Sequence, residues 1–171
     1  MKHKILKMIR ESEGKHVSGE SIAKKFHVSR TAIWKHVQEL RRIGYVIDSV
    51  VKSGYSFYSA PDLLLPDEIQ NGLDTKKIAK QIKYFDSTNS TNEQAKKLIS
   101  DRKNEIVDGT LIVAEEQTSG KGRLDRKFYS PHAQGILFSL ILTPKIPPQD
   151  APKFTLAAAV AISKTMHDYY S

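Results

Sequence analysis

The sequence predicts an α+β fold in two unequal parts: a basic N-terminal unit of three helices and a β-hairpin over residues 1–60, and a C-terminal unit over 67–171 in which helices pack on a mixed sheet. Helical spacing of apolar residues dominates before residue 44, whereas strand-like apolar runs interleave with helices after residue 80. Charge divides the chain in the same way. Lys and Arg outnumber Asp and Glu by 12 to 5 in residues 1–60, a net +7, but only by 15 to 14 in residues 61–171.

The first two helices are predicted from apolar spacing and from a capping residue. Ile5, Leu6 and Ile9 lie on one face of the first helix. The second helix covers residues 18–26, and the hydroxyl of Ser18 at its start can accept a hydrogen bond from a free backbone N–H. A lysine-rich polar face on each helix leaves the apolar face to form a small core.

A third helix over residues 30–43 follows after a short turn, with Ser29 as its cap and Gly44 at its end. Two helices joined by a tight turn form a helix-turn-helix. Strand-like segments at 45–50 and 55–58 then form a hairpin. The N-terminal unit is therefore predicted to be a winged helix-turn-helix.

The outer face of the third helix is predicted to bind DNA. At about 100° per residue, Ile33, Val37 and Leu40 fall together on the core face. The opposite face carries cations for phosphates and hydrogen-bonding groups for base edges, which suits a major groove. A merely solvated face, or a protein-binding surface around the outward Trp34, is the alternative. The predicted DNA-binding residues are Ser29, Arg30, Thr31, Trp34, Lys35, Gln38, Arg42 and, at the tip of the wing, Lys52.

Proline-bearing residues 61–66 are predicted to form a linker. The strand predicted over 135–142 is almost wholly apolar, so both of its faces should be covered. The elements expected after the linker are a short helix from Pro66 or Asp67 to Leu73, a strand over 80–85, a helix over 91–102, strands over 110–114 and 135–142, and a helix over 153–169 whose alanines permit close packing.

A glycine-rich, cationic loop follows the strand over 110–114. Within Gly120-Lys-Gly-Arg123, the glycines let backbone N–H groups approach an anion, and the cations supply mobile charge. The spacing matches neither a P-loop nor a dinucleotide-binding fingerprint. A solvated basic hairpin loop is the alternative to a binding loop.

A polar turn precedes the helix over 91–102. Ser90 or Thr91 can cap this helix, and Glu93, three residues after Ser90, completes a capping box. Such a structural role is sufficient to explain these residues. Hydroxyl and amide groups at a helix N-terminus can also recognise a small polar head group, such as a ureido group or a carboxylate.

Together these motifs resemble biotin–protein ligases. The segments 90–92, 109–117, 120–131 and 135–139 occur in order and at family-like spacing. With the N-terminal unit, the match is to the bifunctional type that is both ligase and biotin-operon repressor. The resemblance implies a class II synthetase-like catalytic domain after the winged helix-turn-helix. The chain stops at Ser171, before the family's Lys-Trp-Pro-Asn-Asp strand, so we expect it to be truncated and incomplete for catalysis.

The resemblance also implies a role for individual residues. Lys121 stands where Arg is usual, which weakens the case for bidentate phosphate contact, and Phe128 stands where many relatives have Trp near the adenine. The implied catalytic residues are Arg123 and Lys121. The implied biotin-binding residues are Ser90, Thr91, Asn92, Gln117, Lys121, Gly122 and Arg123, and the implied adenylate-binding residues are Arg123, Arg126 and Phe128.

Biotin, ATP and substrate-associated Mg²⁺ are the ligands that the resemblance implies, and biotin operator DNA, a biotin carboxyl carrier protein and a second copy of the chain are the implied partners. The chain has no Cys, its six His show no ligand spacing, and no segment is apolar enough for a signal peptide or a bilayer span. We therefore expect a cytoplasmic protein without a resident metal or a membrane partner. Two alternatives remain: a repressor whose second unit senses biotin without turnover, and a lipoate or octanoate ligase.

Overall fold

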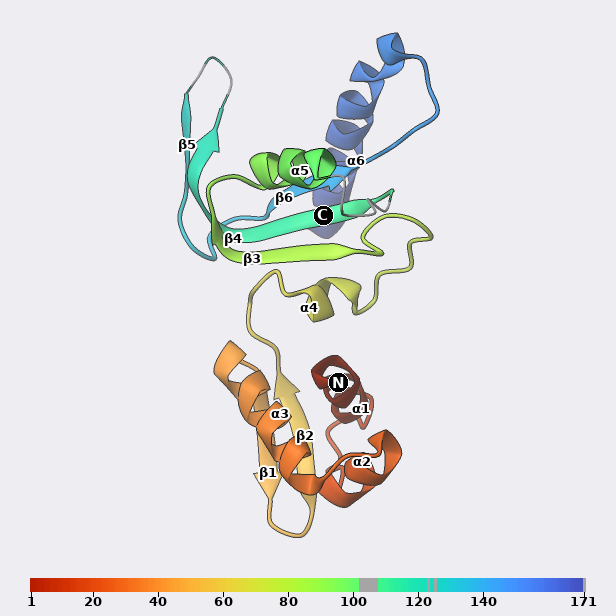
Figure 1. Cartoon of the computed structure of the whole chain (residues 1–171), viewed down its shortest axis with the longest axis vertical. Helices are drawn as coiled ribbons and strands as arrows, with labels where there is room; N and C mark the ends of the chain where they lie inside the picture. The colour runs from red at the N-terminus through yellow and green to blue at the C-terminus, as the bar shows by residue number, and fades with distance from the viewer. Residues whose placement is uncertain (102–107, 123, 125, 171) are drawn as a thin grey trace.

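The structure is a computed structural model that describes residues 1–101, 108–122, 124 and 126–170. Two units follow each other along the longest axis of the molecule, and the short helix α4 lies between them (Figure 1). One unit contains three helices and a two-stranded hairpin. The other contains a four-stranded mixed sheet with helices. The predicted α+β fold is confirmed.

The helices of the N-terminal unit begin and end where their capping residues predict. Ser18 Oγ accepts a hydrogen bond from the Ser21 N–H, and Ser29 Oγ accepts one from the Ala32 N–H. Each bond satisfies a backbone donor that a helix start leaves free. Gly44 ends the third helix in the left-handed conformation, with φ of 108°. The three helices are α1 (Lys2–Arg10), α2 (Gly19–Phe26) and α3 (Arg30–Ile43).

The predicted hairpin is the wing, formed by antiparallel strands β1 (Val46–Val50) and β2 (Gly54–Ser59). Gly54 has φ of 113°, and a Cβ at this position would lie 2.0 Å from the carbonyl oxygen of Val17. Glycine therefore lets the wing reach the segment before α2. The core that joins the wing to the helices contains Ile5, Leu6, Ile9, Ile22, Ala23, Ile33, Val37, Leu40, Tyr45, Ile47 and, from the linker, Leu65.

Helix α4 (Pro66–Gln70) is shorter than the predicted helix to Leu73. Asn71, the residue after it, has an extended backbone, and Gly72 has φ of 89°, so the helical hydrogen-bond pattern cannot continue. Side chains of α4 bond to the N-terminal unit, and these tertiary contacts stabilise a helix that is otherwise very short.

Strand β4 is central to the sheet of the C-terminal unit. It runs parallel to β3 and pairs in antiparallel fashion with both β5 and β6. Helix α5 (Thr91–Ser100) follows β3 and packs on β4 and β6. The last predicted residue of this helix, Arg102, lies outside the described residues. The strands are β3 (Ile82–Thr88), β4 (Thr110–Lys121), β5 (Lys127–Ser130) and β6 (Leu137–Ile141).

The strand predicted over 110–114 is too short. Strand β4 continues to Lys121 because its polar second half pairs with β5, a strand that the apolar pattern does not reveal. Gly120 and Lys121 therefore lie within a strand that forms a hairpin with β5.

Two packing expectations are wrong for the described part of the chain. Ile136 and Phe138, in and next to β6, are 75% and 47% exposed, so this strand is not covered on both faces. Helix α6 (Pro152–Tyr170), which follows a 3₁₀ turn at Pro148–Asp150, has no buried residue, and its alanines do not pack closely. None of the described helices combines the length and the apolar character needed to cross a membrane.

Candidate ligand site and nucleic-acid interface

The candidate ligand site lies where β3 ends and α5 begins, beside the second half of β4. Thr88 at the end of β3 is in parallel register with Gln117 on β4. The chain then turns at Asn89, whose Oδ1 accepts a hydrogen bond from the Ser90 N–H at 2.8 Å. The Asn89 carbonyl accepts another from the Ser119 N–H at 2.9 Å. These bonds tie the turn to β4, so the first turn of α5 lies beside Gln117.

The side chain of Gln117 binds the start of α5. Its Oε1 accepts hydrogen bonds from the backbone N–H of Thr91 at 2.7 Å and from the Thr91 hydroxyl at 3.2 Å. Because a backbone N–H can only donate, this contact fixes the orientation of the amide and leaves Nε2 as its donor group. Ser139 on β6 donates to Thr91 Oγ1 at 2.9 Å. The Thr91 hydroxyl is therefore engaged on both sides and positions Gln117.

The predicted capping box at the start of α5 is wrong. Ser90 is the N-cap residue, but its side chain makes no capping hydrogen bond. Glu93 turns toward two ammonium groups instead, with Lys96 Nζ at 3.3 Å and Lys121 Nζ at 3.5 Å. The hydrogen bond from Lys96 and the positive charges of both lysines lower the pKa of Glu93. The backbone N–H of Thr91, at the start of α5, instead donates a hydrogen bond to Gln117 on β4.

The cationic hairpin extends from this site into solvent. Its tip is closed by a hydrogen bond of 2.7 Å from the Gly122 N–H to the Arg126 carbonyl. Lys121 and Arg126 are exposed, and Phe128 is 55% exposed. Arg123, which the sequence makes the most important cation of the hairpin, lies outside the described residues.

The structure thus brings some of the predicted site residues together and leaves others apart. Ser90 and Thr91 are buried at the start of α5 beside Gln117, whereas Asn92 is exposed. Lys121 is joined to the helix through Glu93. Sequence reasoning assigned no role to Ser139, although a single hydroxyl within an otherwise apolar strand is a signal that can be found.

A groove of about 770 Å³ lies between the start of α3 and the wing. Arg30, Thr31 and Trp34 line the helix side, and Val51 and Lys52 line the wing side. All five side chains are exposed. A cation, a hydroxyl and an indole on a helix that faces a wing suit the major groove of duplex DNA and the phosphates beside it.

The other predicted DNA-binding residues lie in different places on α3 and do not all face the groove. Lys35 is exposed and Gln38 is half-buried on α3, and the Ser29 hydroxyl already serves as the helix cap. Arg42 lies at the far end of α3, where it lines a separate cavity of about 660 Å³ together with Tyr84 of β3. The structure therefore places Arg42 at the junction with the C-terminal unit and away from the groove.

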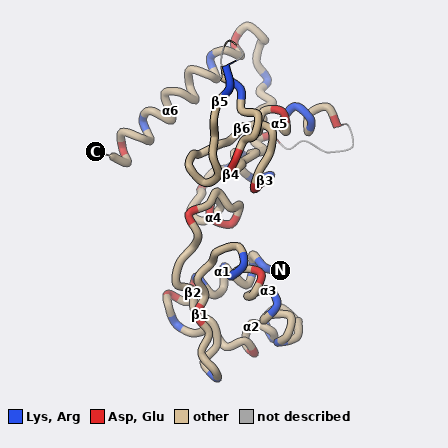
Figure 2. Tube along the Cα trace, turned by 90° about the vertical axis from the view of Figure 1, so that its left-hand side faces the viewer, with Lys and Arg blue, Asp and Glu red and all other residues tan. Residues whose placement is uncertain are grey.

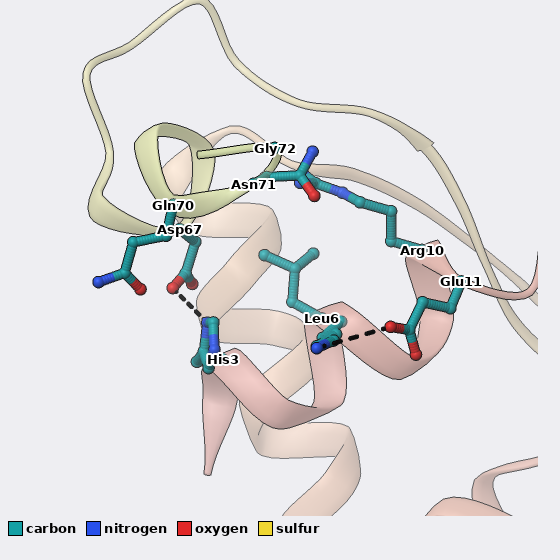
Figure 3. A pocket seen from close by; sticks show the side chains of 9 residues that line it. His3, Leu6, Arg10, Glu11, Asp67, Gln70, Asn71 and Gly72 are labelled. Atoms are coloured by element: carbon teal, nitrogen blue, oxygen red, sulfur yellow. Dashed lines mark hydrogen bonds and ion pairs between the residues drawn. The ribbon is translucent and has the colours of Figure 1, made fainter. Parts of the chain in front are cut away.

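A third cavity, of about 440 Å³, lies between α1 and α4 (Figure 3). The His3 ring bonds to Asp67 at 2.6 Å across it. Glu68, next to Asp67 on α4, accepts a hydrogen bond of 2.5 Å from Arg10 and one of 2.8 Å from the Tyr45 hydroxyl. Acidic residues mark α4 between the two units (Figure 2). These polar contacts around the cavity join α4 to the N-terminal unit.

Comparison with known families identifies both units. Residues 2–56 match the HTH domain family. Residues 84–171, about half of the chain, match the biotin/lipoate A/B protein ligase family. The chain belongs to the biotin/lipoate A/B protein ligase family. The predicted resemblance and the predicted order, a helix-turn-helix unit before a ligase-family unit, are confirmed.

Individual relatives match most of the chain, across both units. A protein named bifunctional ligase/repressor BirA from Bacillus subtilis is 38% identical over 158 residues, which are 92% of this chain and 48% of that protein. The proteins of the same name from Salmonella typhimurium and Escherichia coli are 31% and 30% identical over 155 residues, which are 91% of this chain and 46% of each of them. The chain spans about half the length of the curated relatives it matches.

Proposed function

We propose that this chain is a biotin-dependent repressor and biotin–protein ligase, which binds biotin beside Gln117 and operator DNA through its winged helix. The observation that carries the proposal is that the start of α5 fixes the orientation of the Gln117 amide. The same chain has a groove between α3 and the wing of its helix-turn-helix unit. Membership of the ligase family and the names of the bifunctional relatives support it. The proposed units are residues 1–60 and 67–171, joined by a linker at 61–66.

The proposed biotin site is assigned from polar complementarity. Nε2 of Gln117 is a donor that suits the oxygen of a ureido ring, while Thr91 holds the amide in place. The hairpin cations then lie on the side from which a carboxylate or phosphate would approach. The residues proposed for this site are Ser90, Thr91, Asn92, Gln117, Lys121, Gly122 and Arg123, with Arg126 and Phe128 for the adenylate.

The proposed reaction has two steps. A carboxylate oxygen of biotin attacks the α-phosphorus of ATP, giving biotinyl-5′-adenylate and pyrophosphate. A lysine amine of a carrier protein then attacks the acyl carbon and AMP leaves. Cations on the hairpin offset the phosphate charge, and closure of the hairpin keeps water from the mixed anhydride. Mg²⁺ is proposed to enter with the ATP phosphates, whose oxygens are ligands that it prefers.

Ligand binding is proposed to control DNA binding through association of two copies. A dimer presents two winged helices to the two half-sites of a palindromic operator. If biotinyl-adenylate favours the dimer, the same free energy couples adenylate binding to operator binding. This function belongs in the cytoplasm, where operator DNA and the carrier protein are both accessible.

The ligand assignment can be tested by calorimetric titration of the chain with biotin, biotinyl-5′-adenylate and lipoate. Selective binding of the two biotin ligands is the expected result. Preference for lipoate would assign the site to the other branch of the family. Absence of binding by the folded chain would contradict the proposed site. A parallel assay for biotin transfer separates a ligase from a repressor that senses biotin without turnover.

The DNA assignment can be tested with Lys35→Ala. Loss of one phosphate contact should weaken operator binding across sequences and reduce the slope of log K against log salt by about 0.9. Lys164→Ala on the exposed helix α6 is the matched control and should change neither quantity. An unchanged affinity and slope for Lys35→Ala would show that this face of α3 does not contact DNA.

A further inference from the structure

Ser130, the last residue of β5, has a buried hydroxyl without a protein partner. Its side chain is 6% exposed, and among the described residues no group accepts from or donates to its Oγ. Most buried polar side-chain atoms are hydrogen-bonded, so an unbonded one requires an explanation. Burial of a hydroxyl without a partner costs free energy, and a ligand that bonds to it recovers that cost.

The position of Ser130 places this hydroxyl beside Gln117. The two residues lie directly opposite each other in the antiparallel β4–β5 ladder. Side chains of such a pair lie on the same face of the sheet, with Cβ atoms about 4.5–5.5 Å apart. On this face Gln117 reaches the first turn of α5. The Ser130 hydroxyl and the Gln117 amide therefore share the face on which the ligand site lies.

The hydrogen-bonding capacities of the two side chains are complementary to a cyclic urea. Oε1 of Gln117 is occupied by Thr91, so its free Nε2 can only donate. The Ser130 hydroxyl can also accept. A cyclic urea has a carbonyl oxygen that accepts and, next to it, ring N–H groups that donate. A dithiolane ring has neither of these groups.

We propose that Ser130 is a binding residue for the ureido ring: its Oγ accepts a hydrogen bond from a ring N–H while Gln117 Nε2 donates to the ureido oxygen. This inference rests on the proposed function, which supplies biotin as the ligand. It adds a residue from β5 to a site otherwise built from α5 and β4, and it makes the β4–β5 hairpin part of head-group recognition.

Replacement of Ser130 should change the affinity for biotin without lowering the stability of the ligand-free chain. Ser130→Ala removes a hydroxyl that bonds to no protein group, so the melting temperature of the ligand-free chain should stay the same or rise. Biotin affinity should fall by roughly 2- to 12-fold, the effect of one neutral hydrogen bond. A serine that only supports the fold would lose stability when it is replaced.

The test compares the full chain in three forms: wild type, Ser130→Ala and the control Ser87→Ala. Ser87 is exposed and pairs with Glu116, the neighbour of Gln117, so its side chain lies on the other face of the sheet. Thermal unfolding is measured without ligand, and the Kd for biotin and for lipoate is measured by calorimetry. Biotin binding weakened only in Ser130→Ala, at unchanged melting temperature, is the expected result.

Two results would overturn the inference alone: equal biotin affinity in wild type and Ser130→Ala, or an affinity loss that comes with a lower melting temperature. A wild-type chain that is folded but binds no biotin would overturn the proposed function and the inference with it. Weaker binding in Ser87→Ala equal to that in Ser130→Ala would also overturn the inference, because the effect would then not depend on the face of the sheet.

Discussion

In the proposed biotin site, Thr91 is a positioning residue and Gln117 is the residue that binds the ligand. The resemblance assigns both to biotin. In the structure the Thr91 hydroxyl donates to Gln117 and accepts from Ser139, while its backbone N–H also binds Gln117. The capacity that remains for a ligand is on Gln117 Nε2. The hydrogen bonds from Thr91 thus determine which group of Gln117 is available to a ligand.

Replacement of Gln117 by Glu tests this division. A carboxylate keeps an oxygen for the Thr91 N–H but has no N–H to donate, so Gln117→Glu should fold with little loss of stability and lose most biotin affinity. Gln117→Ala should also lose stability, by about 1–3 kcal/mol, because the buried Thr91 N–H is left unpaired. Thermal unfolding and calorimetry measure the two effects. Biotin binding retained by the Glu variant would contradict the donor role.

His132 provides a prediction about pH. Its Nε2 lies 3.0 Å from Asp86 Oδ1, and this hydrogen bond, followed by the charge of Asp86, raises the pKa of His132 above 6.5. Protonated His132 therefore stabilises the fold below pH 6.5, and the contribution is lost as the pH rises through the higher folded pKa. Titration of the imidazole by NMR should show that Asp86→Asn returns the pKa toward its ordinary value. An unchanged pKa would rule out the pair.

Strand β4 joins the core, the linker and the ligand site along one element. Its first half is buried, at Ile112 and Val113 among others. Glu115, in the middle, is 1% exposed and accepts a hydrogen bond of 2.7 Å from the Leu64 N–H of the linker. Its second half carries Gln117 and pairs with β5. The linker contact at Glu115 therefore lies two residues from the candidate site at Gln117 on the same strand.

Gly120 is the position at which the β4–β5 hairpin is most sensitive. A Cβ there would lie 2.7 Å from the carbonyl oxygen of Phe128, a backbone atom on the paired strand. Gly120→Ala should therefore open the hairpin and speed amide exchange at Lys121 and Phe128. Gly135→Ala, whose Cβ would meet only the Leu137 side chain at 3.6 Å, should leave exchange unchanged. Equal exchange in both variants would show that the hairpin tolerates the added methyl group.

In the whole molecule, the segment over residues 64–70, which contains α4, connects the N-terminal unit to the ligase-family unit. Glu68 bonds to Arg10 and Tyr45 on one side, while Leu64, four residues earlier, bonds to Glu115 on the other. Burial, together with the hydrogen bond to Glu68, raises the pKa of Tyr45 well above its usual range. These bonds therefore join both units to the segment over residues 64–68.

Replacement of Glu68 tests the connection. In Glu68→Ala the partly buried Arg10 guanidinium and the Tyr45 hydroxyl lose their shared acceptor, which should cost about 1–3 kcal/mol of unfolding free energy. Chemical denaturation measures the cost, and the melting of the two units should separate. Asp62→Ala, an exposed carboxylate of the linker, is the control and should be neutral. A cost no greater than that of the control would show that α4 does not hold the units together.

Short-range patterns were sufficient for much of this fold. Apolar spacing and the caps at Ser18, Ser29 and Gly44 predicted the three helices, and strand-like runs on either side of Gly54 predicted the wing. The same local reasoning failed at β5 and at the capping box of α5. Strand β5, of four residues, is too short to show a repeating apolar pattern. Glu93 bonds to Lys96 of its own helix and to Lys121, which lies on β4 and far away in the sequence.

The sequence alone determined the two units, their order and the family motifs, because each depends on residues close together in the chain. The tertiary structure decided how the polar groups are used. Gln117 and Thr91 are 26 residues apart, Ser139 and Thr91 are 48 apart, and Leu64 and Glu115 are 51 apart. Hydrogen bonds over such separations depend on strand register, and only the folded sheet sets that register.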